Sequence, residues 1–195
     1  MRDDKTGIQA YGPRAVRALP DPLKQILVNH LSPVLLGCKP AALFTAPQAL
    51  LPGLLPALRS SRLSLRVLRE GRAGLLVMVF DKERLETAIA WEPAGAILRG
   101  LGYPARAPVW ACLGCLKQKL ASGQFPHEIG LFLGYPAEDV LGFVKHRGRN
   151  YKLCGYWKVY GDVEQAKCCF RRYDRCRDRL RILFFAPEQR VHRTP

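Results

Sequence analysis

Alternating apolar and polar positions predict a β-hairpin in the first half of the chain. Residues 64–70 place Leu65 and Val67 between polar neighbours, and the turn-forming sequence GRAG at 71–74 separates them from the unbroken apolar run LLVMVF at 75–80. Alternation is typical of a half-buried strand, and a short continuous apolar run flanked by turn residues is typical of a fully buried one. We therefore expect a hairpin whose second strand is buried.

Helical spacing of apolar residues predicts helices around this hairpin. Helices should begin at Asp21-Pro22, after the cap residue Asp81, at about 108, at about 137 and after Asp162. The segments 125–135 and 151–160 are rich in apolar and aromatic residues punctuated by glycine and proline, and we predict a strand in each. The last helix carries an apolar stripe from Ala166 to Phe184, with most of its arginines on the other faces.

The segment from Pro40 to Leu58 contains no charged residue, which is long enough to raise the possibility of a membrane span. Four prolines, at positions 40, 47, 52 and 56, would repeatedly break a spanning helix. We predict two short buried helices here and no membrane span.

These elements predict an α+β fold in one domain over residues 1–195. The expected architecture is a mixed β-sheet of about four strands, including the hairpin, layered with α-helices. Within it we expect a helical part over about 1–60, a sheet-and-helix part over about 61–185, and a flexible basic tail at 186–195. The 195 residues are enough to bury a core without disulfides or a structural metal.

The charge of the chain changes the range of possible partners. A formal net charge of +15 points to an anionic ligand or to nucleic acid, although the excess is spread along the sequence. Arginine outnumbers lysine by 21 to 10, which compositional bias alone can produce. The densest group of basic residues comprises Arg171, Arg172, Arg175, Arg177, Arg179 and Arg181 in the last predicted helix.

The first seventeen residues mix acidic and basic side chains and lack the apolar core of a signal peptide, so we expect a cytoplasmic location. Seven irregularly spaced cysteines then favour reduced thiols over a disulfide framework. The CxxC at Cys112 and Cys115 fits a helix with one thiol toward the core, and we assign no metal to it. Phosphate-binding P-loops, GxSxG elbows, dinucleotide-binding GxGxxG turns and calcium loops are absent from the sequence.

A few residues could carry chemistry, and each also has a purely structural explanation. His127 and Glu128 are adjacent and could exchange protons, but a hydrogen-bonded structural histidine explains the pair equally well. Lys39 and Lys158 lie beside apolar or aromatic residues, where an ammonium group could meet an anion or simply extend to solvent. Cys154 and Gly155 lie in an aromatic segment, where a missing side chain allows either a ligand or a packed side chain to approach the backbone.

Three blocks of sequence resemble a bacterial family found mainly in anaerobic Firmicutes, the domain of unknown function 3793 family. They are SPVLLGCKPAALF at 32–44, FPHEIGLFLGYPAEDVLGF at 125–143 and NYKLCGYWKVYGD at 150–162, in the order and spacing of the family. The resemblance implies no established activity. It directs attention to the polar and aromatic residues of the blocks, because a packing core would need only the apolar positions.

Our leading hypothesis is that the three blocks form a cleft that binds an anionic small molecule or cofactor. Ligand contacts would come from Lys39, Tyr135, Asp139, Cys154, Gly155, Trp157, Lys158 and Tyr160, and His127 with Glu128 would transfer protons if the protein is an enzyme. One alternative is nucleic-acid binding through the arginine-rich last helix. Another is a haem, iron or redox-partner module that uses the thiols and His127. The sequence identifies neither a cofactor nor an oligomeric state.

Overall fold

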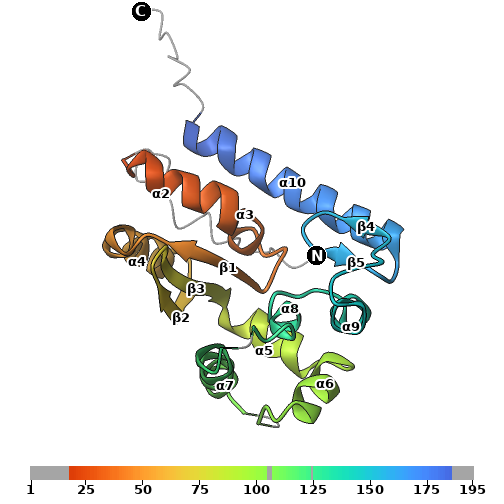
Figure 1. Ribbon diagram of the computed structural model, residues 1–195. Helices are drawn as coiled ribbons and strands as arrows, with labels where there is room; N and C mark the ends of the chain where they lie inside the picture. Colours follow the sequence, from red (N-terminus) through yellow and green to blue (C-terminus); the bar gives the residue numbers. More distant parts are fainter. Residues whose placement is uncertain (1–17, 105–106, 124, 186–195) are drawn as a thin grey trace, which may run out of the picture.

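The computed structural model describes residues 18–104, 107–123 and 125–185, and it shows the expected α+β fold (Figure 1). Its main sheet consists of β1 (Ala41–Ala46), β2 (Leu63–Gly71) and β3 (Gly74–Asp81), in the antiparallel order β1-β3-β2. The predicted hairpin is confirmed, because β2 and β3 pair up to Gly71 and Gly74 at the turn.

The central position of β3 in the sheet explains why its sequence is an unbroken apolar run. Val77 and Val79 enter one buried cluster, whereas Met78 and Phe80 enter another on the opposite face of the sheet. Successive side chains of a strand point to opposite faces, so a strand covered on both sides must be apolar throughout.

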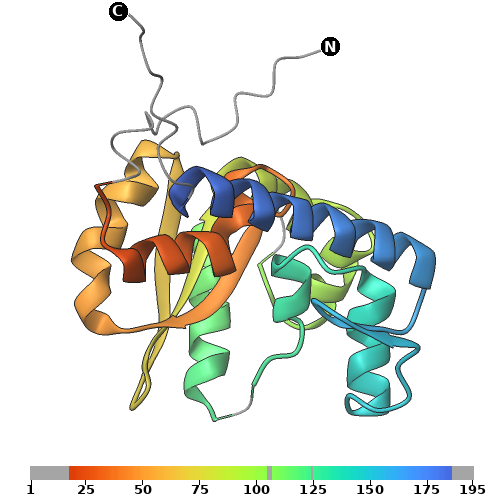
Figure 2. The same ribbon diagram turned by 90° about the horizontal axis from the view of Figure 1, so that it is seen from above.

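One face of the sheet is covered by helices from both ends of the described chain (Figures 1 and 2). They are α2 (Asp21–Ile26), the π-helical turn η2 (Leu27–Leu31), α3 (Ser32–Leu35), α4 (Leu51–Ser60) and the last turns of α10 (Val163–Phe185). The helix expected at Asp21-Pro22 is confirmed. The π-helical turn after it ends two residues before Pro33, which has no N–H to continue the regular hydrogen-bond ladder.

The other face is covered by α5 (Lys82–Ala90), α6 (Ala94–Gly100), α7 (Val109–Ala121) and α8 (Ile129–Phe132). Asp81 caps α5 as predicted, since its carboxylate accepts a 3.0 Å hydrogen bond from the backbone N–H of Arg84. The negative charge of the carboxylate also interacts favourably with the positive end of the helix dipole. Asp81 therefore stabilises the start of α5 both by a hydrogen bond and by its charge.

The remaining elements form a third, smaller layer beside the first turns of α10 (Figure 2). They are α9 (Ala137–His146) and a two-stranded antiparallel ribbon of β4 (Leu153–Cys154) and β5 (Lys158–Val159). Trp157 and Val159 pack against Ala166 and Tyr173 of α10 in a separate apolar cluster.

Several sequence-based expectations about individual elements were wrong. Two short helices were expected in 40–58, but the first part of this segment forms the strand β1. Ala41 to Ala46 pair with β3, and this pairing overrides the low strand propensity of alanine. The η3 turn (Gln48–Leu50) and α4 follow it. The segment expected as a strand at 125–135 contains α8, because a short apolar run does not distinguish a buried helix from a buried strand.

The strand expected at 151–160 is a tight ribbon that turns at Gly155, whose N–H donates to the carbonyl of Trp157 at 3.0 Å. The strands therefore form two separate antiparallel sheets among the described residues in place of one mixed sheet. Within the same part of the chain, no helix combines the length and apolar character that a bilayer span requires. The tail expected at 186–195 lies outside the described residues.

Candidate functional site

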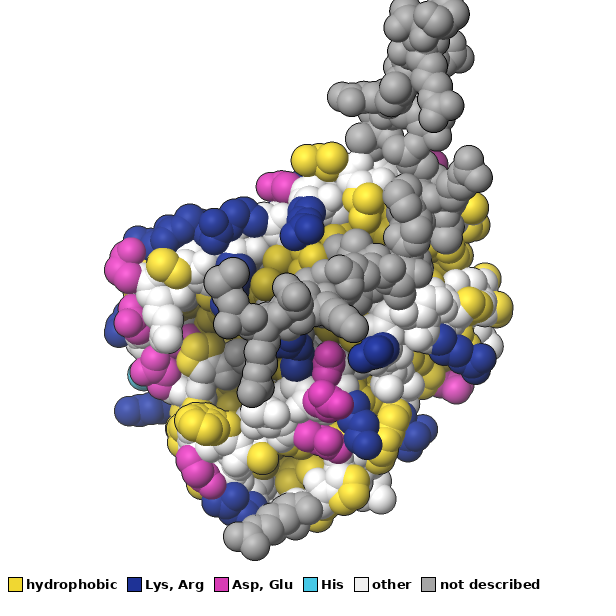
Figure 3. All heavy atoms as spheres, turned by 180° about the vertical axis from the view of Figure 1, so that it is seen from behind, with side chains coloured by type: hydrophobic (Ala, Val, Ile, Leu, Met, Phe, Trp, Pro, Cys, Tyr) yellow, Lys and Arg dark blue, Asp and Glu magenta, His cyan; other side chains and the backbone are white. Residues whose placement is uncertain are grey.

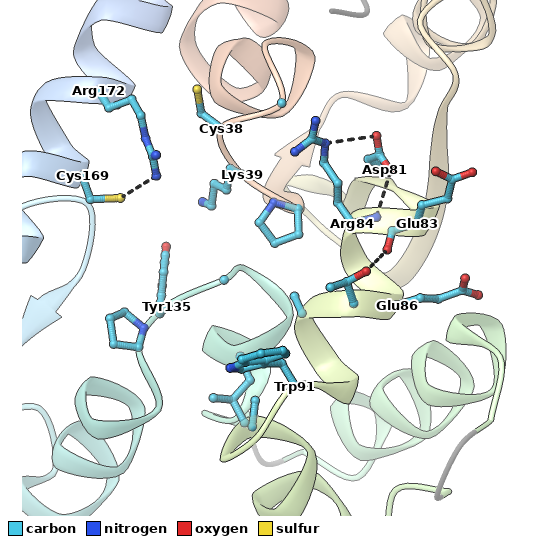
Figure 4. Close-up of a pocket in the computed structure, with 18 of the residues that line it drawn as sticks. Cys38, Lys39, Asp81, Glu83, Arg84, Glu86, Trp91, Tyr135, Cys169 and Arg172 are labelled. Carbon is cyan, nitrogen blue, oxygen red and sulfur yellow. Dashed lines mark hydrogen bonds and ion pairs between the residues drawn. The ribbon is translucent and has the colours of Figure 1, made fainter. Parts of the chain in front are cut away.

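A groove of about 1860 Å³ lies between α10, α5 and the loop that leads into β1 (Figure 4). Its lining comes from segments far apart in the sequence, at 37–40, 60–62, 81–94, 131–137, 157 and 165–175. The first and second of the resembling blocks contribute to it, and Trp157 represents the third. The structure thus brings one part of each block to the same cavity.

Lys39 is the central cation of this groove. Its ammonium group lies 5.1 Å from the ring centroid of Tyr135 and 5.9 Å from that of Tyr173. Burial, the larger cause, lowers the pKa of this amine to about 8, and the nearby Cys169 acts in the opposite direction. Within the described part of the chain, no carboxylate lies within ion-pair distance of its nitrogen. The ring faces stabilise the cation but leave its N–H donors available.

The groove is divided by charge. Figure 4 shows Lys39 pointing into the cavity toward Tyr135, Cys169 and Arg172, whereas Glu83 and Glu86 point away from it. Seen from behind in Figure 3, Lys and Arg side chains form a row along α10, and acidic side chains form a group near the centre of this face, beside further Lys and Arg side chains. The α10 wall therefore provides positive potential around Lys39, supplied by Arg172 and Arg175.

The α5 wall holds a cation that is already paired. Arg84 approaches Asp81 at 3.7 Å between Nε and Oδ2, and its guanidinium lies where a side chain at Gly37 would otherwise project. The glycine has a φ of +68°, so both its backbone conformation and its crowding favour the absence of a side chain. The turn before Cys38 and Lys39 is thereby fixed against α5.

Tyr135 and Trp157 form the aromatic floor beneath Lys39. Their rings stack at 4.8 Å with an interplanar angle of 26°, and burial raises the pKa of the Tyr135 phenol to about 12. Trp157 is held in turn by Asp139, which accepts its indole N–H at 2.7 Å. A stacked, hydrogen-bonded pair presents a rigid surface to the ammonium group.

Asp139 was expected among the ligand contacts, but the structure gives it a structural role. Asp139 is 2% exposed, and besides the indole N–H its carboxylate accepts the backbone N–H groups of Tyr160 and Gly161 at 2.7 and 2.8 Å. Three hydrogen bonds satisfy a buried carboxylate and compensate for its removal from water. Asp139 joins α9 to the end of the β4–β5 ribbon and does not line the groove.

Lys158 and Tyr160 also lie outside the groove lining. The Lys158 ammonium donates to the carbonyl of Gly148 at 2.8 Å and lies 4.8 Å from the ring centroid of Tyr151. It therefore satisfies a carbonyl in the turn after α9. The ring of Tyr160 stacks on His146 at 5.6 Å.

Cys154 and Gly155 belong to the ribbon and do not line the groove either. Cys154 is exposed. A side chain at Gly155 would overlap the ring of Phe170 from α10. Of the two explanations open for this glycine, packing against a neighbouring helix is the one that the structure supplies.

His127 and Glu128, expected as a proton-transfer pair, are not brought to the groove. His127 is exposed, with its ring 4.9 Å from that of Phe143. Glu128 accepts a hydrogen bond from the Tyr103 hydroxyl at 3.1 Å and pairs with Lys119 at 3.2 Å. Its carboxylate raises the pKa of the Tyr103 phenol, after burial as the larger cause. These contacts join the start of α8 to α7 and to the segment that precedes α7.

Two groups of groove residues were missed as site residues by sequence reasoning. Arg172 and Arg175 were assigned only to a nucleic-acid hypothesis, because nothing local shows that α10 passes beside Lys39. Trp91, at the end of α5, is 74% exposed and lines the groove. The sequence signal for Trp91 is its position directly before Glu92 and Pro93, where a helix must end. That its side chain is exposed in the groove is visible only in the structure.

Among the described residues, no group of three or more His, Cys, Asp or Glu side chains converges as a metal site would require. All seven cysteines are free thiols. A protein-ligated iron centre therefore has no ligand cluster in this part of the chain on which to rest.

The geometry defines a class of protein: an α+β domain with an aromatic-floored groove between α10, α5 and the loop that leads into β1, basic on its α10 wall. Residues 27–190 match the family model described as a protein of unknown function, DUF3793. Because the match covers well over half of the chain, the protein belongs to this family, and the resemblance of the three blocks is confirmed. No curated protein and no solved structure matches the chain.

Proposed function

We propose that this protein binds an anionic small molecule in the groove, with Lys39 as the central cation. The carrying observation is a half-buried ammonium group that points into a cavity, has no carboxylate partner among the described residues, and shares the groove lining with Arg172 and Arg175. Keeping such a cation in a partly dry site costs free energy that a bound anion recovers. A structural lysine would have a carboxylate or carbonyl acceptor, as Lys158 has.

The ligand should also carry a planar apolar part. A groove of about 1860 Å³ is far larger than an inorganic anion needs. The exposed indole of Trp91 lies at its α5 side, away from the basic α10 wall. Exposed tryptophan in a cavity is a stacking surface, and stacking on an aromatic side chain contributes about 1–3 kcal/mol for a nucleobase. An aromatic ring linked to a phosphate or carboxylate fits both ends.

Equilibrium binding of three probes tests this proposal: inorganic phosphate, ribose 5-phosphate and AMP, each measured by calorimetry at pH 7. We expect AMP to bind most tightly, and Lys39→Met to weaken all three by at least tenfold. Trp91→Ala should weaken AMP and leave ribose 5-phosphate unchanged. Lys117→Met removes an equal charge from an exposed position on α7 outside the groove and serves as the control. Equal affinities of the parent and Lys39→Met for every probe would refute the proposal.

The nucleic-acid alternative is weakened by the surroundings of the arginines on α10. Arg177 pairs with Asp174 at 2.6 Å, and Arg181 approaches Asp178 at 3.8 Å, so part of the basic stripe is neutralised one turn away. Backbone tracking needs several unpaired cations in register. Binding of mixed DNA or RNA that weakens steeply with salt, and that survives Lys39→Met, would favour this alternative over the groove.

A further inference from the structure

Two cysteines from distant parts of the chain meet beside the groove. Cys38 follows α3 and lines the cavity, and Cys176 belongs to α10. Their sulfur atoms are 3.4 Å apart, with the Cys176 thiol donating to Cys38. A disulfide has a sulfur–sulfur distance of about 2.05 Å, so bond formation needs a closure of only about 1.4 Å.

The surroundings of the two thiols are different. Cys176 is 6% exposed, and burial raises the pKa of its thiol to about 12, with the hydrogen bond to Cys38 acting in the same direction and Arg172 and Arg175 acting against it. Cys38 is half-buried and accepts the hydrogen bond from Cys176. Cys38 is therefore the thiol that a reagent in the groove meets first, and Cys176 is the partner held ready behind it.

We propose that Cys38 and Cys176 form a redox-active dithiol site that reacts with low-molecular-weight disulfides. In the first step the Cys38 thiolate attacks one sulfur of R–S–S–R, forming a mixed disulfide and releasing R–S⁻. In the second step the Cys176 sulfur attacks Cys38 Sγ, gives up its proton, and displaces a second R–S⁻. Two protein thiols are oxidised to one disulfide, one small disulfide is reduced to two thiols, and the protons pass to the two leaving groups.

The bond would connect α10 to the loop before β1, which carries Lys39 directly after Cys38. It would close a loop across most of the described chain, and cross-links of long loops restrict the unfolded state most strongly. Oxidation should therefore raise the resistance of the protein to urea. This inference stands on the thiol geometry and does not depend on the anion-binding proposal.

Oxidised glutathione is the probe for the test. The reduced full-length protein is incubated with it, remaining thiols are alkylated under denaturing conditions, and the digest is examined by mass spectrometry. We expect a cross-linked peptide pair containing Cys38 and Cys176, removed by dithiothreitol, and a higher urea midpoint for the oxidised protein. The exposed Cys154 should carry only a glutathione adduct and serves as the internal reference.

Two variants identify the order of the steps. Cys176→Ser should stop the reaction at a glutathione adduct on Cys38, whereas Cys38→Ser should leave Cys176 unmodified because it is buried. Neither variant should gain urea resistance on oxidation. The proposal is overturned if the parent protein retains both thiols, stops at a mixed disulfide on Cys38, or links Cys38 to Cys169 instead.

Discussion

Replacing Lys39 by methionine should stabilise the protein while weakening anion binding by at least tenfold. The substitution keeps an unbranched side chain of similar length between the rings of Tyr135 and Tyr173 but removes the charge. Methionine adapts well to irregular spaces and makes favourable contacts with aromatic rings. The variant therefore separates the energetic cost of the charge from the packing of the side chain.

The expected gain follows from the pKa of the amine. A pKa of about 8 in place of the ordinary 10.5 corresponds to about 3 kcal/mol of free energy spent on holding the charged form in the folded protein. Lys39 is only half-buried, so water screens part of this cost and about 2 kcal/mol remains. Two ring contacts offset some of it, at about 0.5 kcal/mol each. We expect a gain of about 1–2 kcal/mol at pH 7, or about 2–8 °C in the midpoint of thermal unfolding.

The pH dependence gives the gain a signature that packing cannot imitate. Below about pH 8 the amine is charged in both the folded and the unfolded state, so the full cost is present. Between about 8 and 10.5 the unfolded state binds more protons than the folded one, and the stability of the parent rises with pH relative to the variant. Near the upper end of this interval the two proteins should converge.

Urea unfolding of the parent and Lys39→Met at half-unit steps from pH 6 to 10 measures the difference directly. Lys117→Met, which removes an exposed lysine, should show no comparable convergence. A variant that is less stable than the parent at pH 7, or a difference that stays constant up to pH 10, would show that Lys39 is not held as a strained cation. A gain of stability without loss of phosphate affinity would refute the link between the strained charge and binding.

Three further substitutions have expected outcomes that urea unfolding measures. Asp139→Ala leaves the indole of Trp157 and two backbone N–H groups without their acceptor and should cost about 3–5 kcal/mol; a cost below about 1 kcal/mol would contradict its structural role. In Gly155→Val the new side chain should overlap Phe170 and lower the free energy of unfolding by about 1–3 kcal/mol. The double variant Gly155→Val/Phe170→Ala should lose less stability than the sum of the losses of the two single variants, and additive losses would contradict the overlap. Tyr160→Phe removes a buried hydroxyl that has no hydrogen-bond partner among the described residues, so it should leave stability unchanged or raise it by about 1 kcal/mol, and a clear loss would reveal a missing partner.

The elements that could be predicted are those whose signals are local. The hairpin of β2 and β3 is encoded by alternation, a glycine-containing turn and an apolar run, all within eighteen residues. The start of α5 is encoded by Asp81, which caps it without help from the rest of the fold. By contrast, half of the residues of β1 are alanines, and it is a strand because β3 lies beside it. Tertiary pairing of this kind is absent from the sequence pattern.

The same distinction applies to the site. Lys39 and Tyr135 could be selected from the resembling blocks because both carry polar atoms beside apolar runs, and both line the groove. Lys158 has the same local pattern as Lys39, yet it bonds to a carbonyl of a nearby turn. The two lysines differ because Lys158 has a hydrogen-bond acceptor, the carbonyl of Gly148, and Lys39 has none among the described residues. The pattern of residue types does not show whether such an acceptor is present. Trp91 and Arg175 could not be placed for the corresponding reason, since the groove forms only when α5 and α10 lie around the first block.

The resembling blocks are joined by one continuous chain of contacts, and this gives their structural residues a connection to the groove. Asp139 fixes the indole of Trp157, the indole stacks on Tyr135, and the ring of Tyr135 lies beneath the ammonium group of Lys39. Each contact joins two different blocks or two distant parts of one block. The polar residues of the blocks therefore divide by position along this chain: those at one end satisfy buried groups, and the lysine at the other end is left unsatisfied. Along this chain of contacts the Asp139 carboxylate and the Trp157 indole are satisfied, whereas the ammonium group that faces the cavity has no hydrogen-bond acceptor among the described residues. This arrangement supports the proposed ligand, because nothing in the fold itself requires a charge at that end.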